Sequence, residues 1–319
     1  MFGIVPHNRA QKIGFLLMPD FSMIAFTAAI EPLRAANRLN RKPLYDWQSY
    51  SLDGLPVTAS NHVAITPDDA LANGQDCDVI FVCAGLRPRR FLSRQLRGEI
   101  RGFALRGTHL GAVCTGSEAL AYAGVLTGYR CTIHWENIET FKEVYPALDI
   151  TATLFEIDRN RYTCSGGTAP IDMMIHAIKL DHGETLALNV AEQLLHNFIR
   201  EPQESQRMAI EHRTGISHPK LLAAIGYMEV YIETPLTIEK LAAAVGLSAR
   251  QLERLFRLQL GTTPAKYYLN IRLERARHFL RQTPMSVMEI GLVCGFNSAS
   301  NFSRSYRKTY GHAPNAERL

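Results

Sequence analysis

Residues 295–314 read GFNSASNFSRSYRKTYGHAP, and residues 246–264 read GLSARQLERLFRLQLGTTP. The two stretches share a first glycine, a serine, an aromatic residue followed by arginine, a second glycine and a proline, offset by 49 residues at the first glycine and by 50 from the serine onward. Serine favours a helix N-cap and glycine a helix end, so the first copy predicts a helix over Ile238–Val245, a turn at Gly246 and a second helix from Ser248 to Leu260. The repeat therefore predicts two helix-turn-helix units, at 238–259 and 286–309.

A small residue precedes each turn glycine by four positions, Ala242 in the first copy and Gly291 in the second. Small side chains there allow two helices to cross closely, as a helix-turn-helix requires. Polar residues on each second helix suit base edges or phosphates, and two such helices on one scaffold would enter successive major grooves about 34 Å apart. The alternative is a helical bundle whose arginines only face solvent. The predicted DNA-facing residues are Arg250, Glu253, Arg254, Arg257, Ser300, Ser303, Arg304 and Lys308.

The charge of the chain is unevenly distributed. Residues 212–319 contain fifteen Lys and Arg but seven Asp and Glu, a net charge of +8, whereas residues 1–211 carry −3. All the excess positive charge thus lies in one third of the chain, which predicts a polyanion partner for that part alone. Double-stranded DNA is the expected partner.

The length of 319 residues and a hydrophobic content of 46% indicate a globular chain of about two domains. No apolar run approaches the roughly 18 residues that a membrane span needs, and the N-terminus does not read as a signal peptide, so we expect a cytoplasmic protein without membrane contact. The six cysteines form no Cys-x-x-Cys pair and no finger spacing, which argues against a disulfide framework and a zinc site. We expect neither a metal nor a cofactor.

The first two thirds of the chain alternate strand-like and helical patterns, which predicts an α/β sandwich with a mostly parallel sheet. A polar stretch follows, and from Lys220 onward only helical patterns remain. The expected domains are 1–200, a linker at 201–217, and an all-α domain at 218–319. The expected strands or extended segments are Lys12–Met18, Asp46–Leu52, Val57–Ala59, Val79–Cys83 and Thr108–Val113, and the expected helices are Met23–Leu39, Leu92–Arg106, Ser117–Ala123, Ala169–His182 and Glu184–Ile199.

The motif Gly111-Ala-Val-Cys114-Thr115-Gly116 lies between an expected strand and an expected helix. It has the form of a nucleophile elbow, a strained turn that presents a side chain above the sheet. A helix N-terminus at Cys114 would favour its thiolate. The alternative is a small residue that only fills a tight corner, and His134 is a candidate base if the cysteine is catalytic.

Two further segments suit a small ligand. Trp135 and Glu136 offer an aromatic face and a counter-charge for a cationic nitrogen, although a tryptophan at a surface or in a dimer contact would look the same. The turn Ser165-Gly166-Gly167-Thr168 precedes a helix, so its amides are candidates to hold a carboxylate, unless the glycines serve only the turn. Asp172 is expected only to cap or pair locally. The predicted ligand-binding residues are Cys114, Thr115, His134, Trp135, Glu136, Gly166 and Gly167.

The stretch at 295–314 resembles the signature of AraC/XylS-type transcriptional regulators. Lys12–His182 resembles the PfpI-like branch of the class I glutamine amidotransferase-like fold, a flavodoxin-like architecture. Active members of that superfamily place a histidine after the cysteine and an acid after the first strand; this chain has Thr115 and, in the matched segment, Ala25, while Glu31 matches a different position. The resemblance therefore implies a degenerate site with no catalytic residues.

Together with Glu31-Pro-Leu-Arg-Ala-Ala-Asn37 and Thr-Ile-His-Trp at 132–135, these motifs resemble the bacterial GlxA-like regulators, whose members control arginine, glycine betaine and carnitine catabolism. The resemblance implies a homodimeric activator of a catabolic operon that acts with RNA polymerase and responds to a small amino acid, betaine or carnitine. Helices within 169–199 are the candidate dimer contacts. Two alternatives remain: an amidase- or hydratase-type enzyme that uses Cys114 and carries a DNA-binding tail, and a front domain that is only a dimerisation scaffold.

Overall fold

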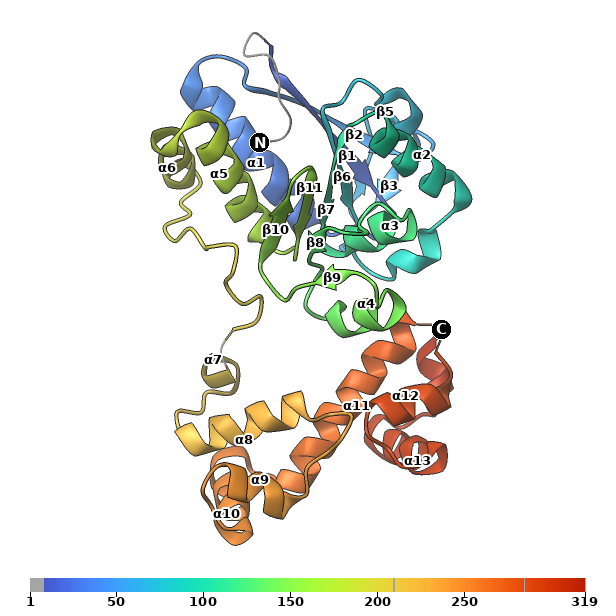
Figure 1. The fold of residues 1–319 in the computed structure, drawn as a ribbon, viewed down its shortest axis with the longest axis vertical. Coiled ribbons are helices and arrows are strands. Elements are labelled where there is room, and N and C mark those ends of the chain that lie inside the picture. The colour runs from blue at the N-terminus through green and yellow to red at the C-terminus, as the bar shows by residue number, and fades with distance from the viewer. Residues whose placement is uncertain (1–8, 209, 284, 319) are drawn as a thin grey trace. The chain divides into compact units, whose positions relative to one another are not determined.

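The computed structural model describes residues 9–208, 210–283 and 285–318 (Figure 1). The chain forms two compact units, Met1–Gln206 and Arg207–Leu319. The boundary lies inside the polar stretch 201–217, which also contains the short helix α7 (Ile210–Thr214). Each unit is described by itself.

A seven-stranded sheet with the strand order β10-β11-β7-β6-β1-β2-β5 forms the centre of the first unit. Only the β10–β11 pairing is antiparallel. The inner order β2-β1-β6-β7-β11 is that of flavodoxin-like doubly wound folds, so the predicted α/β sandwich with a mostly parallel sheet is confirmed. The strands are β1 (Gln11–Leu17), β2 (Tyr45–Ser51), β5 (Asp69–Ala70), β6 (Val79–Cys83), β7 (His109–Val113), β10 (Phe155–Asp158) and β11 (Arg161–Cys164).

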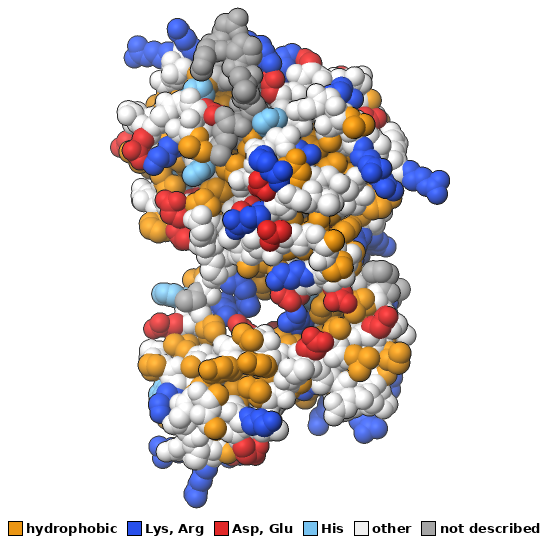
Figure 2. Space-filling view, viewed as in Figure 1, with side chains coloured by type: hydrophobic (Ala, Val, Ile, Leu, Met, Phe, Trp, Pro, Cys, Tyr) orange, Lys and Arg blue, Asp and Glu red, His pale blue; other side chains and the backbone are white. Residues whose placement is uncertain are grey.

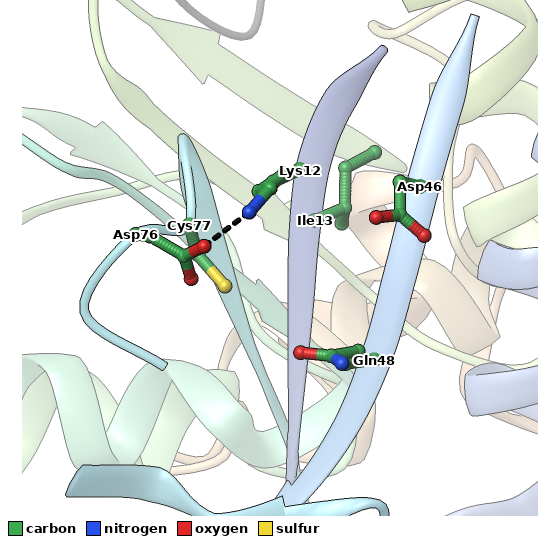
Figure 3. A pocket seen from close by; sticks show the side chains of 6 residues that line it. All are labelled: Lys12, Ile13, Asp46, Gln48, Asp76 and Cys77. Carbon is green, nitrogen blue, oxygen red and sulfur yellow. Dashed lines mark hydrogen bonds and ion pairs between the residues drawn. The ribbon is translucent and has the colours of Figure 1, made fainter. Parts of the chain in front are cut away.

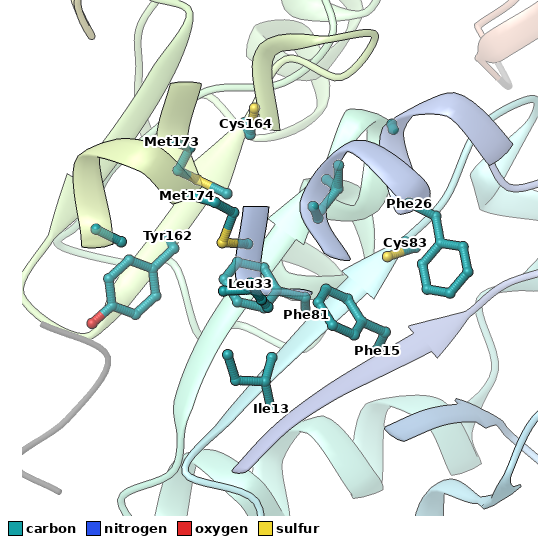
Figure 4. Packing of buried hydrophobic residues seen from close by; sticks show 14 of the residues in the cluster. Ile13, Phe15, Phe26, Leu33, Phe81, Cys83, Tyr162, Cys164, Met173 and Met174 are labelled. Carbon is teal, nitrogen blue, oxygen red and sulfur yellow. The ribbon is translucent and has the colours of Figure 1, made fainter. Parts of the chain in front are cut away.

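Helices cover both faces of this sheet, and successive strand residues point to opposite faces. Phe15 and Phe81 stack in the cluster that α1, α5 and α6 cover, where Met173 and Met174 also lie (Figure 4), whereas Leu16 belongs to the cluster on the other face. On the first face lie α1 (Met23–Asn40), α5 (Ala169–His182) and α6 (Glu184–Gln193); on the other lie α2 (Arg94–Leu105), α3 (Ser117–Tyr122) and α4 (Ile138–Val144). Two small ladders pair β3 (Val57–Thr58) with β4 (Ala64–Ile65) and β8 (Arg130–Cys131) with β9 (Asp149–Ile150), and 3₁₀ turns occupy Leu71–Asn73, Pro88–Phe91 and Cys114–Gly116.

The described part of the second unit contains helices and no strand. Two apolar clusters divide it, one around Phe256 and one around Phe302, and the long helix α11 contributes Tyr268 to the first and Leu273 to the second. This architecture is the predicted all-α domain. The helices besides α7 are α8 (Pro219–Val230), α9 (Ile238–Ala244), α10 (Ala249–Leu260), α11 (Pro264–Gln282), α12 (Val287–Val293) and α13 (Ala299–Tyr310), followed by a 3₁₀ turn at Pro314–Arg318.

Both predicted helix-turn-helix units are present. Gly246 and Gly295 adopt φ values of 64° and 77° at their turns, and Ser248 forms a capping box with Gln251 at the start of α10. A Cβ atom at Gly291 would lie 3.4 Å from the Cβ of Phe302, which explains the small residue predicted where the two helices cross.

The expected helix over Glu184–Ile199 is too long. Helix α6 ends at Gln193, and Leu195 has a φ of 54°, a left-handed conformation that interrupts helical backbone. The sequence also does not indicate β8, β9 or β10, because these strands are two to four residues long and carry little periodicity. None of the helices in the described ranges is long and apolar enough to cross a membrane.

The close packing of the sheet gives a first prediction. A Cβ atom at Gly111 of β7 would overlap the ring of Phe81, whose Cγ would lie 2.8 Å away, whereas Gly98 of α2 has open space. Gly111→Ala should therefore lower the free energy of unfolding by about 1–3 kcal/mol, and Gly98→Ala should raise it by about 0.5–1 kcal/mol. Both tryptophans, Trp47 and Trp135, lie in the first unit, so urea unfolding followed by tryptophan fluorescence measures this unit alone. Equal stabilities of the two variants would contradict the packing.

Candidate functional site

The turn at Cys114 lies at the carboxyl edge of the sheet, between β7 and α3. Cys114 has a φ of 60°, a left-handed conformation that costs energy for a residue with a Cβ atom. A Cβ atom at Gly116 would overlap the carbonyl oxygen of Val82 in β6, so the turn sits directly against the neighbouring strand. The strained elbow predicted from the sequence is present.

Two other loops close over this elbow. The backbone N–H of His134 donates to the carbonyl of Cys114 at 3.4 Å, and the hydroxyl of Ser117 donates to the carbonyl of Thr132 at 2.7 Å. On the other side, a Cβ atom at Gly166 would lie 2.7 Å from the Cβ of Cys114. The fold therefore brings together three segments that are far apart in sequence and that were proposed to form one pocket.

The expected ligand-binding side chains differ in exposure. Thr115 is buried, and its hydroxyl donates to the carbonyl of Gly85 at 2.7 Å. Trp135 is 36% exposed and packs beside the ring of His134, whose Nδ1 lies 4.0 Å from a carboxylate oxygen of Glu136. The ring of Trp135 and the carboxylate of Glu136 thus each lie beside His134, next to the elbow.

The amides of the glycine turn are partly occupied. The N–H of Ser165 donates to the carbonyl of Leu154 at 3.0 Å, and the backbone of Gly166 hydrogen-bonds the thiol of Cys164. Gly167 has a φ of 58° and open space at its Cβ position. Both glycines therefore serve the turn, and Gly167 is the one at which added atoms would meet no neighbour.

The surroundings of Cys114 favour the thiol over the thiolate that a helix start alone would favour. Burial raises the pKa of the thiol to about 12, and the nearby carboxylate of Glu136 acts in the same direction, while the amide of Thr115 offsets part of the effect. The desolvation of a buried anion outweighs the attraction of a short helix start. Cys114 is a neutral thiol at physiological pH.

The segment after β1 has an alanine at the position that the sequence matched to the acid of active superfamily members. Ala25 is buried in α1, and Glu31 is a partly exposed residue that pairs with Arg34 at 2.6 Å. Among the described residues, no group of three or more His, Cys, Asp or Glu is arranged to hold a metal ion. All six cysteines are buried free thiols.

Asp172 does not pair locally, as the sequence suggested, but is the centre of a long-range network. Its carboxylate is fully buried and receives Arg200 Nη2 at 2.6 Å, the backbone N–H of Arg200 at 2.8 Å and a hydrogen bond with His196 Nε2 at 2.8 Å. Arg200 also donates to the hydroxyl of Thr168 at the end of the glycine turn. The sequence gives no signal of this network beyond a single aspartate in the first turns of a helix.

The same segment is fixed again six residues later. The side-chain amide of Gln206 donates to Thr132 Oγ1 at 2.9 Å, to the carbonyl of Ile133 at 3.0 Å and to the carbonyl of Thr153 at 2.8 Å. Residues 196–206, which we name the tether, therefore contact the glycine turn at one end and the loop of Thr132–Glu136 at the other. Both of these loops flank Cys114.

A small polar hollow that opens to solvent lies elsewhere in the first unit (Figure 3). Lys12 and Asp46 lie at the starts of β1 and β2, and Asp76 precedes β6, so the hollow opens at the amino edge of the sheet. Lys12 and Asp76 pair with each other across it. Open α/β sheets bind ligands at the carboxyl edge, so we do not assign the effector to this hollow.

The predicted DNA-facing side chains lie on α10 and α13. All are exposed except Ser303, which is partly buried, while Leu252 and Phe256 of α10 and Phe302 and Tyr306 of α13 form the inner face. Figure 2 shows Lys and Arg side chains at the lower edge of the second unit, where α10 and α13 lie in Figure 1. Within the described residues, the predicted basic contacts have no ion-pair partner, in contrast to Arg277 and Arg281, which bind Glu317. The unpaired residues are Arg250, Arg254, Arg257, Arg304 and Lys308.

Comparisons with known proteins agree with this architecture. The DJ-1/PfpI family model matches residues 11–180, and a helix-turn-helix domain model matches residues 241–319. The HTH-type transcriptional regulator GbdR of Pseudomonas aeruginosa is 45% identical over 317 residues, 99% of this chain and 86% of that protein. The chain belongs to the HTH-type transcriptional regulators with a DJ-1/PfpI domain.

The resemblance to GlxA-like regulators is also confirmed. GlxA of Rhizobium meliloti, an HTH-type transcriptional regulator, is 37% identical over 312 residues, 98% of this chain and 96% of that protein. The crystal structure of an AraC family transcriptional regulator from Pseudomonas putida is 30% identical and superposes with a TM-score of 0.54, covering 58% of this chain and 99% of that one.

The chemistry of Cys114 gives the second prediction. With a pKa near 12, the fraction of thiolate at pH 8 is about a thousandfold below that of an ordinary cysteine. Alkylation of Cys114 by iodoacetamide should be slow in the folded regulator and should rise about tenfold per pH unit up to pH 10 without a plateau. Mass spectrometry of the peptide that contains Cys114 measures this rate, with Cys114→Ser as the control for peptide assignment. A plateau below pH 8 would show an activated thiolate instead.

Proposed function

We propose that this chain is an effector-responsive activator in which the elbow at Cys114 closes one side of a small-molecule site, and in which α10 and α13 read two adjacent major grooves. The duplication of the exposed, unpaired arginine face in both helix-turn-helix units carries the DNA-binding part of this proposal. The convergence of the Cys114, Thr132–Glu136 and Ser165–Thr168 segments at one sheet edge supports the effector part.

The effector that suits this edge is a small molecule with a cationic nitrogen and a carboxylate. Trp135, which is 36% exposed, supplies an aromatic ring, and Glu136, the next residue, supplies a carboxylate; this combination suits quaternary or primary ammonium groups. Gly167, which has open space at its Cβ position, lies just before the start of α5, where backbone N–H groups suit a carboxylate. Small amino acids, betaines and carnitine share this chemistry.

We further propose that the first unit binds its effector without converting it. A neutral Cys114, a Thr115 whose hydroxyl is engaged by Gly85, and the absence of an acid at Ala25 leave no activated nucleophile and base pair. The second candidate, an amidase- or hydratase-type enzyme, rests on the preserved elbow geometry alone.

The tether offers a route from effector to DNA-binding unit. It contacts both loops that flank Cys114, and it is followed directly by the second unit, which begins at Arg207. An effector that binds better when these loops close would favour the docked tether, and only such a difference in affinity shifts the equilibrium. Effector binding thereby alters how the second unit is presented.

We propose that the active form is a cytoplasmic homodimer that contacts RNA polymerase. Leu180, Leu188, Leu195 and Phe198, all within 169–199, are more than half exposed, and this apolar surface supports the placement of dimer contacts there.

The DNA-facing assignment predicts distinct effects for two kinds of residue. Arg254→Ala and Arg304→Ala should each weaken binding to the operator by about 1–3 kcal/mol if their guanidinium groups contact base edges. Lys308→Ala should weaken binding to all sequences alike and reduce the salt dependence of affinity by about one counterion, as expected for a phosphate contact. Gel-shift titrations over a range of salt concentrations measure both effects, with Arg38→Ala of α1 as a control in the other unit. Unchanged binding of both arginine variants would contradict the orientation of the helices.

The effector assignment is tested by a thermal-shift screen against small amino acids, betaines, carnitine and polyamines. A bound compound at 100 times its Kd should stabilise the protein by about 2.7 kcal/mol, and Trp135→Ala should abolish the shift. The compound should be recovered unchanged; its consumption, lost in Cys114→Ser, would favour the enzyme instead. A screen in which Trp135→Ala binds as well as the wild type would contradict the site.

The tether makes a control variant available. Gln206→Ala removes three hydrogen bonds, whereas Gln203→Ala changes an exposed neighbour of the same type. Gln203→Ala should keep both effector affinity and the effector-dependent change in DNA affinity. Gln206→Ala should lose the effector-dependent change in DNA affinity and, because coupling is reciprocal, should bind the effector less tightly. Full coupling in Gln206→Ala would exclude the tether as the route.

A further inference from the structure

The turns of the two helix-turn-helix units are anchored by cations from the helix that precedes each unit. In the first helix-turn-helix unit, Lys220 Nζ of α8 donates to the carbonyl of Gly246 at 2.9 Å. In the second, Arg272 of α11 donates through Nε to the carbonyl of Cys294 at 2.8 Å and through Nη2 to the carbonyl of Gly295 at 2.6 Å. The first anchor is an exposed single bond, whereas the second is a two-pronged contact in a partly buried position.

The anchor from Arg272 also reaches the second recognition helix. Its guanidinium lies 4.2 Å from the centre of the Phe296 ring, and that ring packs against Phe302 of α13 with 5.1 Å between centroids. Phe296 and Phe302 are buried. The position of α13 therefore depends on where α11 holds the turn before it.

The two helix-turn-helix units also contact each other at this turn. A Cβ atom at Gly295 would lie 2.6 Å from Cγ of Pro235 and would overlap the carbonyl oxygen of Ile232. Ile232 and Pro235 belong to the segment that leads into α9, the first helix of the other unit. No residue with a side chain fits at Gly295 without separating the units.

Tyr268, four residues before Arg272 on α11, holds that same segment. Its hydroxyl donates to the carbonyl of Tyr231 and accepts the N–H of Leu236 at 3.4 Å. Residues four apart lie on one face of a helix. From adjacent turns of α11, Tyr268 therefore binds the segment that leads into the first helix-turn-helix unit, and Arg272 binds the turn of the second.

We propose that Tyr268 and Arg272 form a clamp that fixes the distance and rotation between the two recognition helices and so sets the spacing of the DNA sites that the protein accepts. Neither residue needs to touch DNA for this role; both are positioning residues. Two helix-turn-helix units held rigidly can enter two successive major grooves without further ordering. Two units held loosely have to be ordered on binding and accept DNA sites at other spacings. This inference rests on the proposed orientation of α10 and α13 toward DNA.

The test uses the full-length protein and a duplex of about 40 base pairs that the wild type selects from a random-sequence pool, long enough for two adjacent major-groove sites. A second duplex has two extra base pairs between the two segments of DNA that the bound wild type contacts. The wild type should bind the altered duplex about tenfold or more weakly, because one recognition helix loses its base contacts. Arg272→Gln should bind the selected duplex less tightly but distinguish the two duplexes by no more than about threefold.

Three further variants complete the comparison. Tyr268→Phe removes one hydroxyl with little change in shape and should reduce the spacing preference partly, and Arg272→Lys should do the same, since an ammonium group cannot bind both carbonyls in the fixed fork of arginine. Arg281→Gln removes the same charge from an exposed position of α11 and should leave the spacing preference intact. Melting temperatures report whether each variant folds.

The outcomes separate the clamp from the DNA-binding assignment. A folded Arg272→Gln that keeps the full tenfold preference, or an Arg281→Gln that loses it equally, overturns the clamp. Retained affinity in Arg254→Ala and Arg304→Ala overturns the orientation of the recognition helices, whatever the behaviour of Arg272.

Discussion

The backbone contact at Cys114 determines the arrangement of the carboxyl edge of the sheet. The elbow places a left-handed residue against β6 on one side and against Gly166 on the other, with no room for a side chain at either glycine neighbour. This close approach makes the loop of Thr132–Glu136 and the glycine turn into neighbours of one thiol. The same approach removes water from that thiol, so the elbow geometry is present while the thiolate is disfavoured.

Much of the second unit is readable from the sequence because its signals are local. A serine cap, a turn glycine and an apolar spacing of three or four residues each act within one or two helical turns, and duplication gives each signal twice. Such local signals do not predict the hydrogen bonds by which Lys220 and Arg272 anchor the two turns. They join residues more than twenty positions apart, and a basic residue on a helix of a DNA-binding unit reads first as a DNA contact.

In the first unit the sheet and its main helices are predictable from alternation, but the site is only partly so. The elbow follows from its glycines and its place between strand and helix. The state of Cys114 does not, because the sequence shows a helix start but not the burial that outweighs it. The predictions for the end of α6 and for Asp172 are wrong for one reason. Apolar residues such as Leu195 and Phe198 continue a helical pattern in the sequence, but the buried carboxylate of Asp172 binds His196 and Arg200 and so brings this segment back to α5.

The network at Asp172 has a consequence for the modularity of this architecture. A carboxylate with no exposed surface depends on Arg200 and His196 for compensation, and the loss of a partner of a buried charge costs about 3–5 kcal/mol. The family model for the first domain ends at residue 180, before either partner. As a self-sufficient folding module, the sensor therefore extends beyond its recognisable family boundary, and the chain that leads to the DNA-binding unit is also part of the sensor's own core. A gene fusion that exchanged sensors at the family boundary would separate a buried carboxylate from the residues that hydrogen-bond it.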